Sequence, residues 1–575
     1  MVRRIALVAC MLCLLGVARA DARGAGSSAT VASTVANPEA PVPVEASDAS
    51  PIGRRLSSNQ ALRIARGLPK MRAVRARYPG SYGGAYLKGP GRWQVSFFSK
   101  KNQEIGQVIL ADRNGRVLEQ WTGFQIAWSM ARGYPGAFGR HVNALYIWIP
   151  LCVLFFVPFF DWRKPLRLLH LDLLVLLSFS VSLAYFNHGR IYVSTPLVYP
   201  PLVYLLARML ALARVGGRAV SSIPRAPSSP RLLVPTPLLA IGVIFLIGFR
   251  VGLNVTDSNV IDVGYAGVIG AQRIVGDKPL YGGYPSDNEH GDTYGPVNYE
   301  MYVPFQQALG WSGRWDELPA AHGAAIVFDL LAVGLLFLLG RRARGPALGI
   351  ALAYAWVSYP FTLFSLESNS NDSLVAVFVL AALLVASSAP ARGVFAALAG
   401  LTKFAPLALA PLLCAVGPEN STRSSRARSV ALFTGAFLLT AAIVLVPALT
   451  HDSPHTIFQR TFAYQADRES PFSIWGLYGG SQALKAVQVA IQGAALALAL
   501  AVAILPRRAD LVGLGATAAA VLIAVQLGID HWFYLYIPWF FGLAMLALLG
   551  QFSWAGGGAP VAPSGSARSS RLAAV

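Results

Sequence analysis

The stretch at residues 254–282, NVTDSNVIDVGYAGVIGAQRIVGDKPLYG, directly follows an apolar run long enough to cross a membrane. It holds three aspartates, Asp257, Asp262 and Asp277, among small and aromatic residues. Carboxylates beside a lipid surface are costly unless they face water or a partner, and they commonly mark function. What these three do therefore depends on which side of the membrane they occupy, and this requires the topology of the whole chain.

The composition is that of a membrane protein. The chain has 575 residues, of which 55% are hydrophobic and only 13% charged, and its mean hydropathy is +0.51. Soluble proteins are roughly 25% charged, and the recurring apolar runs here have the length of membrane-spanning helices, about 20 residues. The net charge of +21 would also fit a nucleic-acid-binding protein, but arginine-rich cytoplasmic loops explain it better. We expect no nucleic-acid partner.

The first 54 residues predict an export signal followed by a linker. A basic start, a short apolar run and Ala18-Arg19-Ala20 predict a signal peptide over residues 1–20, cleaved after Ala20. LVAC at residues 7–10 resembles a lipobox, but the apolar run before it is short. Residues 21–54, rich in Ala, Ser and Pro, predict a disordered linker. The cysteines that remain, Cys152 and Cys414, lie in apolar runs, so no structural disulfide is expected.

Residues 55–125 predict a small extracytoplasmic α+β domain. SSNQALRIARGLP, from Ser57, carries a Ser N-cap and helical spacing of apolar residues. RWQVSFFSK, IGQVILA and RVLEQWTG predict strands, and DRNG predicts a turn. This order of a helix followed by strands, closed by DRNGRVLEQWTG, resembles the PepSY domain family. The segment contains no catalytic constellation, and a binding or regulatory role is a hypothesis only.

The rest of the chain predicts an all-α polytopic membrane protein with about eleven spans. Three accessory spans occupy 141–213, a larger membrane domain occupies 232–550, and residues 551–575 form a cytoplasmic tail. The predicted spans are 141–160, 166–187, 193–213, 232–252, 321–340, 345–364, 371–389, 429–449, 481–505, 510–528 and 532–550.

The distribution of charge predicts the orientation. With residues 21–140 outside, four arginine-rich loops fall on the cytoplasmic side, around 163–167, 214–231, 341–344 and 507–508, whereas the acidic loop 253–320 falls outside. The basic loop 417–429 should also be cytoplasmic. The segment 392–416, with Lys403 in its middle and Pro406 and Pro411 after it, must then enter and leave by one face as a broken re-entrant hairpin.

The polar residues expected on the outer face form one coherent set. Arginine and lysine neutralise phosphate, a carboxylate can accept a proton from a hydroxyl, and aromatic rings suit sugars and the membrane interface. Each residue also has a purely structural interpretation. The aromatic residues are more often anchors at the membrane interface, and Asp257 or Asp262 can cap a helix. Asp329, within a predicted span, can form a structural ion pair with Arg250. The set comprises Asp257, Asp262, Tyr265, Tyr294, Asn371, Asp372, Lys403, Arg460, Arg468, His531 and Tyr534.

DVGYAGVIGAQRIVGDKPLYG, from Asp262, resembles the first external loop of the GT-C glycosyltransferase superfamily, in which an Asp at this position is the usual catalytic carboxylate. GLTKFAP, around Lys403, resembles its Gly/Lys segment. SNSND, RESPFSIWG and HWFYLYIPWF are similar to glycosyltransferase family 87, whose members use polyprenyl-phosphate-mannose. Asp262 is followed by Val263 and not by the acidic residue of many such loops, and Asp257 leaves the choice of carboxylate open.

The resemblance implies an inverting transfer of a sugar, mannose by resemblance, from a polyprenyl phosphate to an extracytoplasmic lipid or glycan acceptor, in a bacterial inner membrane. Asp262, with Asp257 as the alternative, would be the base. Lys403, Arg468 and Arg460 would bind the donor phosphate. Tyr265, Tyr294, Asn371, Asp372, His531 and Tyr534 would contact substrate. We expect no cofactor and no metal. The main alternative is a transporter or flippase for a lipid-linked sugar; a haem-binding redox protein is disfavoured because the eight histidines are scattered.

Overall fold

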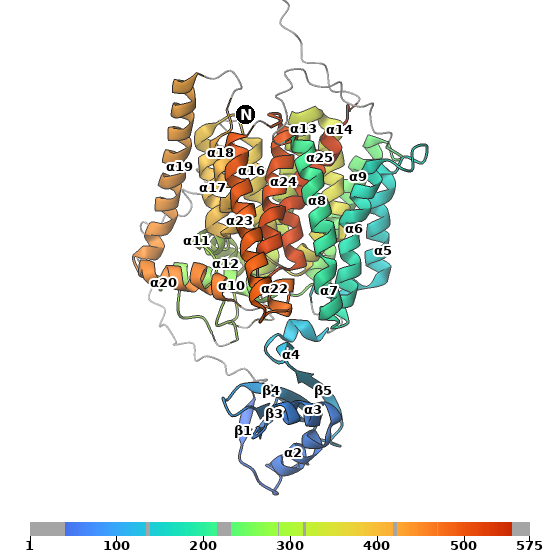
Figure 1. The fold of residues 1–575 in the computed structure, drawn as a ribbon, viewed down its shortest axis with the longest axis vertical. Helices are drawn as coiled ribbons and strands as arrows, with labels where there is room; N and C mark the ends of the chain where they lie inside the picture. Colours follow the sequence, from blue (N-terminus) through green and yellow to red (C-terminus); the bar gives the residue numbers. More distant parts are fainter. Residues whose placement is uncertain are drawn as a thin grey trace, which may run out of the picture.

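The computed structural model describes residues 41–133, 138–214, 232–285, 287–313, 315, 318–417, 422–468, 470–505 and 507–554. The expected signal peptide, most of the expected linker and nearly all of the expected cytoplasmic tail lie outside these residues. A small α+β domain sits at one end of a larger helical body (Figure 1).

The small domain is an antiparallel sheet in the order β1-β2-β3-β4-β5, with α2 (Ser58–Gly67) and α3 (Pro69–Arg77) packed on it. The expected helix is confirmed, and the Ser57 and Gln60 side chains form a reciprocal capping box at its start. The strands are β1 (Val42–Val44), β2 (Tyr82–Leu87), β3 (Arg92–Phe98), β4 (Glu104–Ala111) and β5 (Val117–Thr122).

The domain begins upstream of the expected boundary at residue 55, because β1 lies in the segment expected to be a disordered linker and pairs with β2. Asp112 closes the domain. Its carboxylate accepts the backbone N–H groups of Arg55 and Leu56 and the indole N–H of Trp93, 2.9 Å away. These bonds tie the start of the domain to the β4–β5 turn.

In the described part of the chain, seven helices are long and apolar enough to cross a membrane, or eight if the pair α14 and α15, bent by 57°, makes one span. The remaining expected spans correspond to shorter apolar helices, so the structure does not confirm a count of eleven. The long helices are α6 (Leu168–Asn187), α7 with α8 (Ile191–Ala213), α9 (Thr236–Asp257), α13 (Pro319–Arg344), α19 (Arg423–Leu449), α23 (Gln482–Ile504) and α24 (Leu511–Gly528). The bent pair and the shorter helices are α14 (Pro346–Ser358), α15 (Pro360–Glu367), α5 (Leu145–Phe156), α16 (Asp372–Leu384), α18 (Ala410–Cys414) and α25 (Ile537–Gly550).

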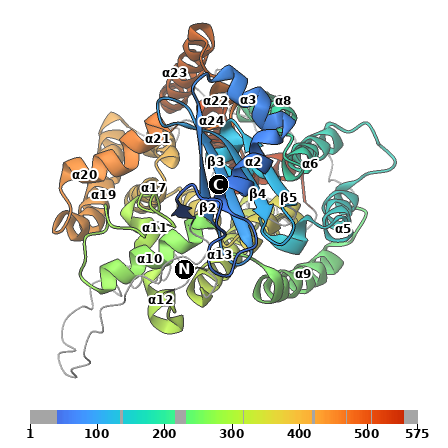
Figure 2. The same cartoon turned by 90° about the horizontal axis from the view of Figure 1, so that it is seen from below.

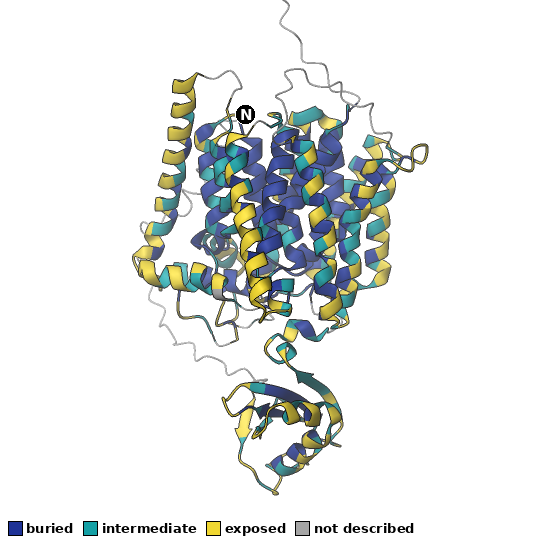
Figure 3. Ribbon diagram, in the orientation of Figure 1, coloured by how far each residue is buried: buried dark blue, intermediate teal, exposed yellow. Residues whose placement is uncertain are grey.

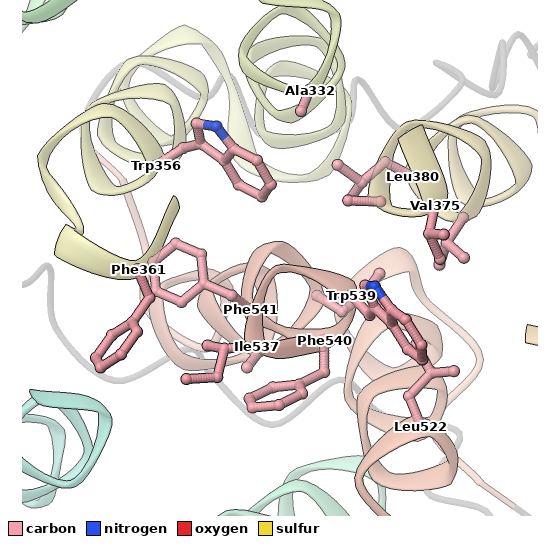
Figure 4. Close-up of a cluster of buried hydrophobic side chains, with 14 of the residues drawn as sticks. Ala332, Trp356, Phe361, Val375, Leu380, Leu522, Ile537, Trp539, Phe540 and Phe541 are labelled. Atoms are coloured by element: carbon pink, nitrogen blue, oxygen red, sulfur yellow. The ribbon is translucent and has the colours of Figure 1, made fainter. Parts of the chain in front are cut away.

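The core of the helical body lies around α25. Phe540 and Phe541 of α25 pack among side chains from α13, α14, α15, α16 and α24 (Figure 4), and the ring of Phe541 stacks on Tyr359 with centroids 4.1 Å apart. By contrast, α19 and α23 stand at the periphery with exposed apolar side chains (Figure 3). Helices that expose apolar side chains along their length are those that face lipid.

The segment expected to be re-entrant folds as a hairpin. α17 (Ala389–Thr402) ends at Lys403, and the chain returns through the 3-10 turn Ala405–Leu409 and α18. Arg392, near the start of α17, donates to the carbonyls of Leu413 and Val416 at 2.8 and 2.7 Å. Both ends of the segment therefore lie together, and Lys403 lies at its tip, as the sequence predicted.

The tip of this hairpin points to the end of the body that carries the small domain. Short helices gather there: α10 (Asp262–Val275), α11 (Pro296–Glu300), α12 (Val303–Leu309), α20 (Pro454–Phe458), α21 (Tyr464–Asp467) and α22 (Ile474–Leu477). Figures 1 and 2 show these helices and the small domain at the same end. The described parts of the loop 253–320, expected on the outer face, lie at this end together with those of residues 450–480. The small domain joins this end through α4 (Phe124–Ala127).

Candidate active site

The first carboxylate of the site is Asp262, in the first turn of α10. The extended residues before α10 run beside the end of α15, where the Asn259 and Ile261 N–H groups donate to the Glu367 and Ser368 carbonyls at 3.1 and 3.2 Å. Gly264 permits this close approach, since a Cβ there would lie 2.3 Å from the Asn369 carbonyl oxygen. The start of α10, whose dipole favours a negative charge, is thereby fixed beside the turn that leads into α16.

The second carboxylate, Asp372, begins α16 and is buried. Its Oδ1 accepts the Lys403 ammonium at 2.6 Å and the Trp539 indole N–H at 2.8 Å, whereas its Oδ2 has no hydrogen-bond partner among the described residues. The preceding Asn371 donates to the Asn298 side-chain oxygen at 2.6 Å. Among the described residues, Asp372 thus bonds directly to a cation, whereas Asp262 does not.

Lys403 lies at the hairpin tip inside a cage of aromatic rings. Its ammonium is 5.4 Å from the centroid of Tyr294, 5.3 Å from that of Tyr536 and 5.3 Å from that of Trp539. Aromatic faces attract cations electrostatically, and the ion pair with Asp372 balances the buried charge. The Lys that the sequence placed at membrane depth is therefore buried, paired and caged.

Arg468 supplies the second cation. Its guanidinium carbon lies 5.1 Å from the ring centroid of Trp128 and 5.9 Å from that of Tyr464. Its Nε is buried and has no hydrogen-bond partner in the described residues. His531 lies nearby, stacked on Trp128 at 5.7 Å and bonded through Nδ1 to the Ser470 hydroxyl at 2.9 Å.

Asp262 lies close enough to Arg468 and Lys403 that both positive charges act on its carboxyl. Its side chain is exposed, in contrast to the residues that follow it in α10, yet enough protein surrounds it that lost hydration raises the pKa of its carboxyl. The positive charges of Arg468 first, and then of Lys403, oppose that rise. Burial, Arg468 and Lys403 together hold the pKa of His531 well below its usual range, which keeps this imidazole neutral.

The structure brings six of the predicted site residues into one place: Asp262, Tyr294, Asp372, Lys403, Arg468 and His531. Asn371 adjoins them through Asp372. The group combines a hydrated carboxylate, two cations and several aromatic faces. It can therefore accept a proton from a hydroxyl while it binds an anion.

Two predicted polar residues are engaged elsewhere. Asp257, at the end of α9, pairs with the imidazole of His141. Arg460 bonds to buried Asp292, with 3.4 Å between Nε and Oδ2. Each of these two side chains therefore already contacts a partner outside the group around Lys403.

Two predicted tyrosines pack as core residues. Tyr265 is buried against Trp315, with ring centroids 4.6 Å apart. Tyr534 is also buried, and its hydroxyl contacts the Ser182 hydroxyl at 2.6 Å. Nothing in these contacts joins either tyrosine to the cations of the site, so their expected role in substrate binding has no geometric support.

Sequence reasoning missed four aromatic residues of the site: Trp128, Tyr464, Tyr536 and Trp539. Tyr536 and Trp539 lie in the same motif as Tyr534, two and five residues further on, but the sequence does not show which ring turns toward Lys403. Trp128 lies in a segment with no motif at all, so no signal pointed to it. In the described residues, no three His, Cys, Asp or Glu side chains lie together as metal ligands would.

The comparisons with known proteins cover part of this site. Residues 293–527 match the family model described as Glycosyltransferase family 87. No curated protein and no solved structure matches the chain. Tyr294, Asp372, Lys403 and Arg468 lie within the matched segment, whereas Asp262, His531 and Trp128 lie outside it. The match does not reach the small domain, whose resemblance to PepSY stays a prediction.

Proposed function

We propose that this chain, whose residues 293–527 match the model of Glycosyltransferase family 87, is a membrane glycosyltransferase that transfers a sugar from a polyprenyl-phosphate donor to an acceptor hydroxyl. Mannose is the proposed sugar, by the resemblance described above, and the acceptor is a lipid or glycan outside the cytoplasm. The observation that carries this proposal is the grouping of one hydrated carboxylate, Asp262, with two cations, Arg468 and Lys403.

Asp262 is the proposed general base. The acceptor oxygen attacks the anomeric carbon as the carboxylate takes the hydroxyl proton, and the bond from that carbon to the phosphate oxygen breaks on the opposite side. The phosphate leaves with the bonding electron pair, and the configuration inverts. A positioned base contributes about 10²–10⁴-fold to such a step. A carboxylate with a raised pKa is a stronger base than a free one, which suits this role.

The leaving phosphate is the group that Arg468 and Lys403 would stabilise. A lipid phosphate gains one negative charge as the bond breaks, and preorganised cations such as the buried Lys403 stabilise such a charge strongly. The Nε donor of Arg468 is available for this, because it has no hydrogen-bond partner in the described residues and the contacts with Trp128 and Tyr464 are cation–π contacts and not hydrogen bonds. The proposal needs no metal ion.

The prenyl tail has an apolar path beside Lys403. Phe404, the next residue, packs on Phe462 with centroids 3.9 Å apart, and Phe462 stacks with Phe458. The last two are 45% and 54% exposed. A row of exposed aromatic rings that begins next to the caged ammonium would hold isoprenoid units while the phosphate stays at the cations.

The test uses membranes that contain the intact protein or its Asp262→Asn variant, supplied with radiolabelled polyprenyl-phosphate-mannose. Transfer of label to a new product by the unmodified protein alone supports the proposal. Transfer that persists in Asp262→Asn but is lost in Asp257→Asn would move the base to the other aspartate. Absence of transfer from every lipid-linked sugar offered would overturn the proposal in favour of a transporter or flippase.

A further inference from the structure

Trp128 joins the small domain to the candidate active site. It directly follows α4, in the segment 123–133 that leads from β5 to the helical body. Its indole ring faces the Arg468 guanidinium at 5.1 Å, stacks on His531 at 5.7 Å and meets the edge of Phe472 at 5.4 Å. A residue outside the family-matched segment thus contacts two groups of the site directly.

The segment that carries Trp128 is fixed to the small domain. Arg132 donates to the carbonyls of Gln125 and Ile126 at 2.8 and 3.0 Å, which folds the segment into a compact loop. The same guanidinium bonds to the Gln107 side chain on β4 at 2.9 Å and lies 5.4 Å from the ring centroid of Trp121 on β5. The loop is therefore held against the sheet by the Arg132 guanidinium.

The other end of the segment is fixed to the helical body. Gly133 has a φ of +73° and packs so closely on the turn after α6 that a Cβ would lie 2.2 Å from the Gly189 nitrogen. Only glycine tolerates both the left-handed backbone and this approach. With both ends held, the position of the Trp128 ring is determined by the two parts of the molecule together.

The contact with Trp128 is a cation–π contact and not a hydrogen bond, so it does not use the N–H donors of Arg468. A ring that lies over a guanidinium interacts with its face, whereas a phosphate binds the N–H groups along its edge. Tyr464 takes the same kind of position at 5.9 Å. Two rings therefore restrict the rotation of Arg468 without using its hydrogen-bond donors, so less conformational entropy is lost when an anion binds.

We infer that Trp128 is a positioning residue for the donor phosphate, so that the exit segment of the small domain forms one wall of the donor site. The ligand class is the phosphodiester of a lipid-linked sugar. This inference rests on the proposed function. It also gives the small domain a defined role, because its sheet, through Arg132, holds the ring that orients Arg468.

The test compares Trp128→Leu and Trp128→Phe in the full-length protein. Leucine cannot make a cation–π contact, so we expect the KM for polyprenyl-phosphate-mannose to rise about tenfold, which corresponds to about 1.4 kcal/mol, with a smaller fall in kcat. The Ki of polyprenyl phosphate, as a product inhibitor, should rise by the same factor. Phenylalanine should restore both constants to within about threefold of the unmodified protein.

The matched control is Trp162→Leu, which removes a comparable ring that faces Arg163 at 5.4 Å in the α5–α6 loop at the opposite end of the helical body (Figure 1); it should change neither constant. If Trp128→Leu does not fold, Arg132→Met loosens the same segment and should raise the donor KM in the same direction. An unchanged KM and Ki in the folded Trp128 or Arg132 variant would overturn the inference. Failure of the unmodified protein to transfer any sugar would overturn the proposed function instead.

Discussion

The Lys403 ammonium lies 2.6 Å from Asp372 Oδ1, and the pair joins the tip of the α17–α18 hairpin to the first residue of α16. Trp539 donates to the same oxygen, so one carboxylate oxygen holds three elements of the fold together. The pair is buried. The structural role of this pair and the chemical role proposed for Lys403 can be separated by substitution.

Lys403→Met should destabilise the protein by about 3–5 kcal/mol, because it leaves the Asp372 carboxylate buried without a cation. The double variant Lys403→Met with Asp372→Leu should recover most of this loss, since no unpaired charge then remains, but it should stay inactive. Thermal unfolding of the purified protein and sugar transfer would be measured in parallel. Recovery of activity in the double variant would show that Lys403 has no role beyond the ion pair.

The buried pair Arg250–Asp329, joined at 2.6 Å within the spans, is the matched control for that experiment. Asp329→Leu should lower the unfolding temperature as strongly as Lys403→Met. In the protein that remains folded, the donor KM should equal that of the unmodified protein, because Arg250 and Asp329 contact none of the cations of the site.

Asp262→Asn should reduce the turnover of sugar transfer by about 10²–10⁴-fold, the usual contribution of a general base. Asparagine keeps the size of the side chain and cannot accept the proton. Asp257→Asn should retain most of the activity, since its carboxylate pairs with His141. The initial rates of the two variants, measured at saturating donor, decide between the aspartates, and the opposite ranking would contradict the assignment of Asp262 as the base.

The pH dependence of kcat/KM should show an acidic limb set by Asp262. Burial raises the pKa of this carboxyl above its usual range, and the base works only when it is deprotonated, so activity should fall as the pH decreases through that raised pKa. Arg468 opposes the rise. Arg468→Gln should therefore move the limb to higher pH, in addition to weakening donor binding.

Arg460→Gln is the control for the pH experiment, because Arg460 pairs with Asp292 and is not among the charges that act on Asp262. Its acidic limb should coincide with that of the unmodified protein. A limb that stays in place in Arg468→Gln would show that another group titrates.

Tyr534→Phe should change the transfer rate by less than about threefold. The hydroxyl contacts Ser182 inside the helical core, and its loss removes one hydrogen bond, worth about 1 kcal/mol of stability. Tyr536→Leu, two residues away, should be far more harmful, since it removes a ring of the Lys403 cage. Kinetic constants of both variants at equal protein amounts test this contrast.

The sequence predicted an element of the structure wherever a single physical constraint determined that element. Apolar runs located the membrane helices, and a Ser N-cap located α2. The basic loop 417–429, expected on the cytoplasmic side, predicted that the segment 392–416 enters and leaves by one face, and Lys403, Pro406 and Pro411 suit such a broken hairpin. Opposite charges in different loops also indicated that Asp262, Lys403 and Arg468 would share a face, and the three do lie at the same end of the helical body.

The sequence was uninformative where tertiary contacts decided the outcome. β2, with the sequence YGGAYL, has low strand propensity at its glycines and forms because β1 and β3 pair with it. Tyr534 and Tyr536 lie in the same 3-10 turn before α25, and only the tertiary fold decides that the Tyr534 hydroxyl contacts Ser182 on α6 whereas the Tyr536 ring contacts Lys403. Trp128 gains its role only because the sheet and the helical body together position its segment.

The hairpin has a consequence for accessibility. Its arms are tied at Arg392, so the turns that flank it, near Ser387 and Gly417, lie at the same end of the helical body. In a variant whose native cysteines are replaced, a single cysteine is placed at one of these two exposed positions. Both single-cysteine variants should react with a membrane-impermeant reagent added to one and the same side of the membrane. A single cysteine placed in the small domain should react with the reagent added to the other side. Lys403 thus contacts Asp372 from the tip of a segment whose two ends both lie away from the small domain.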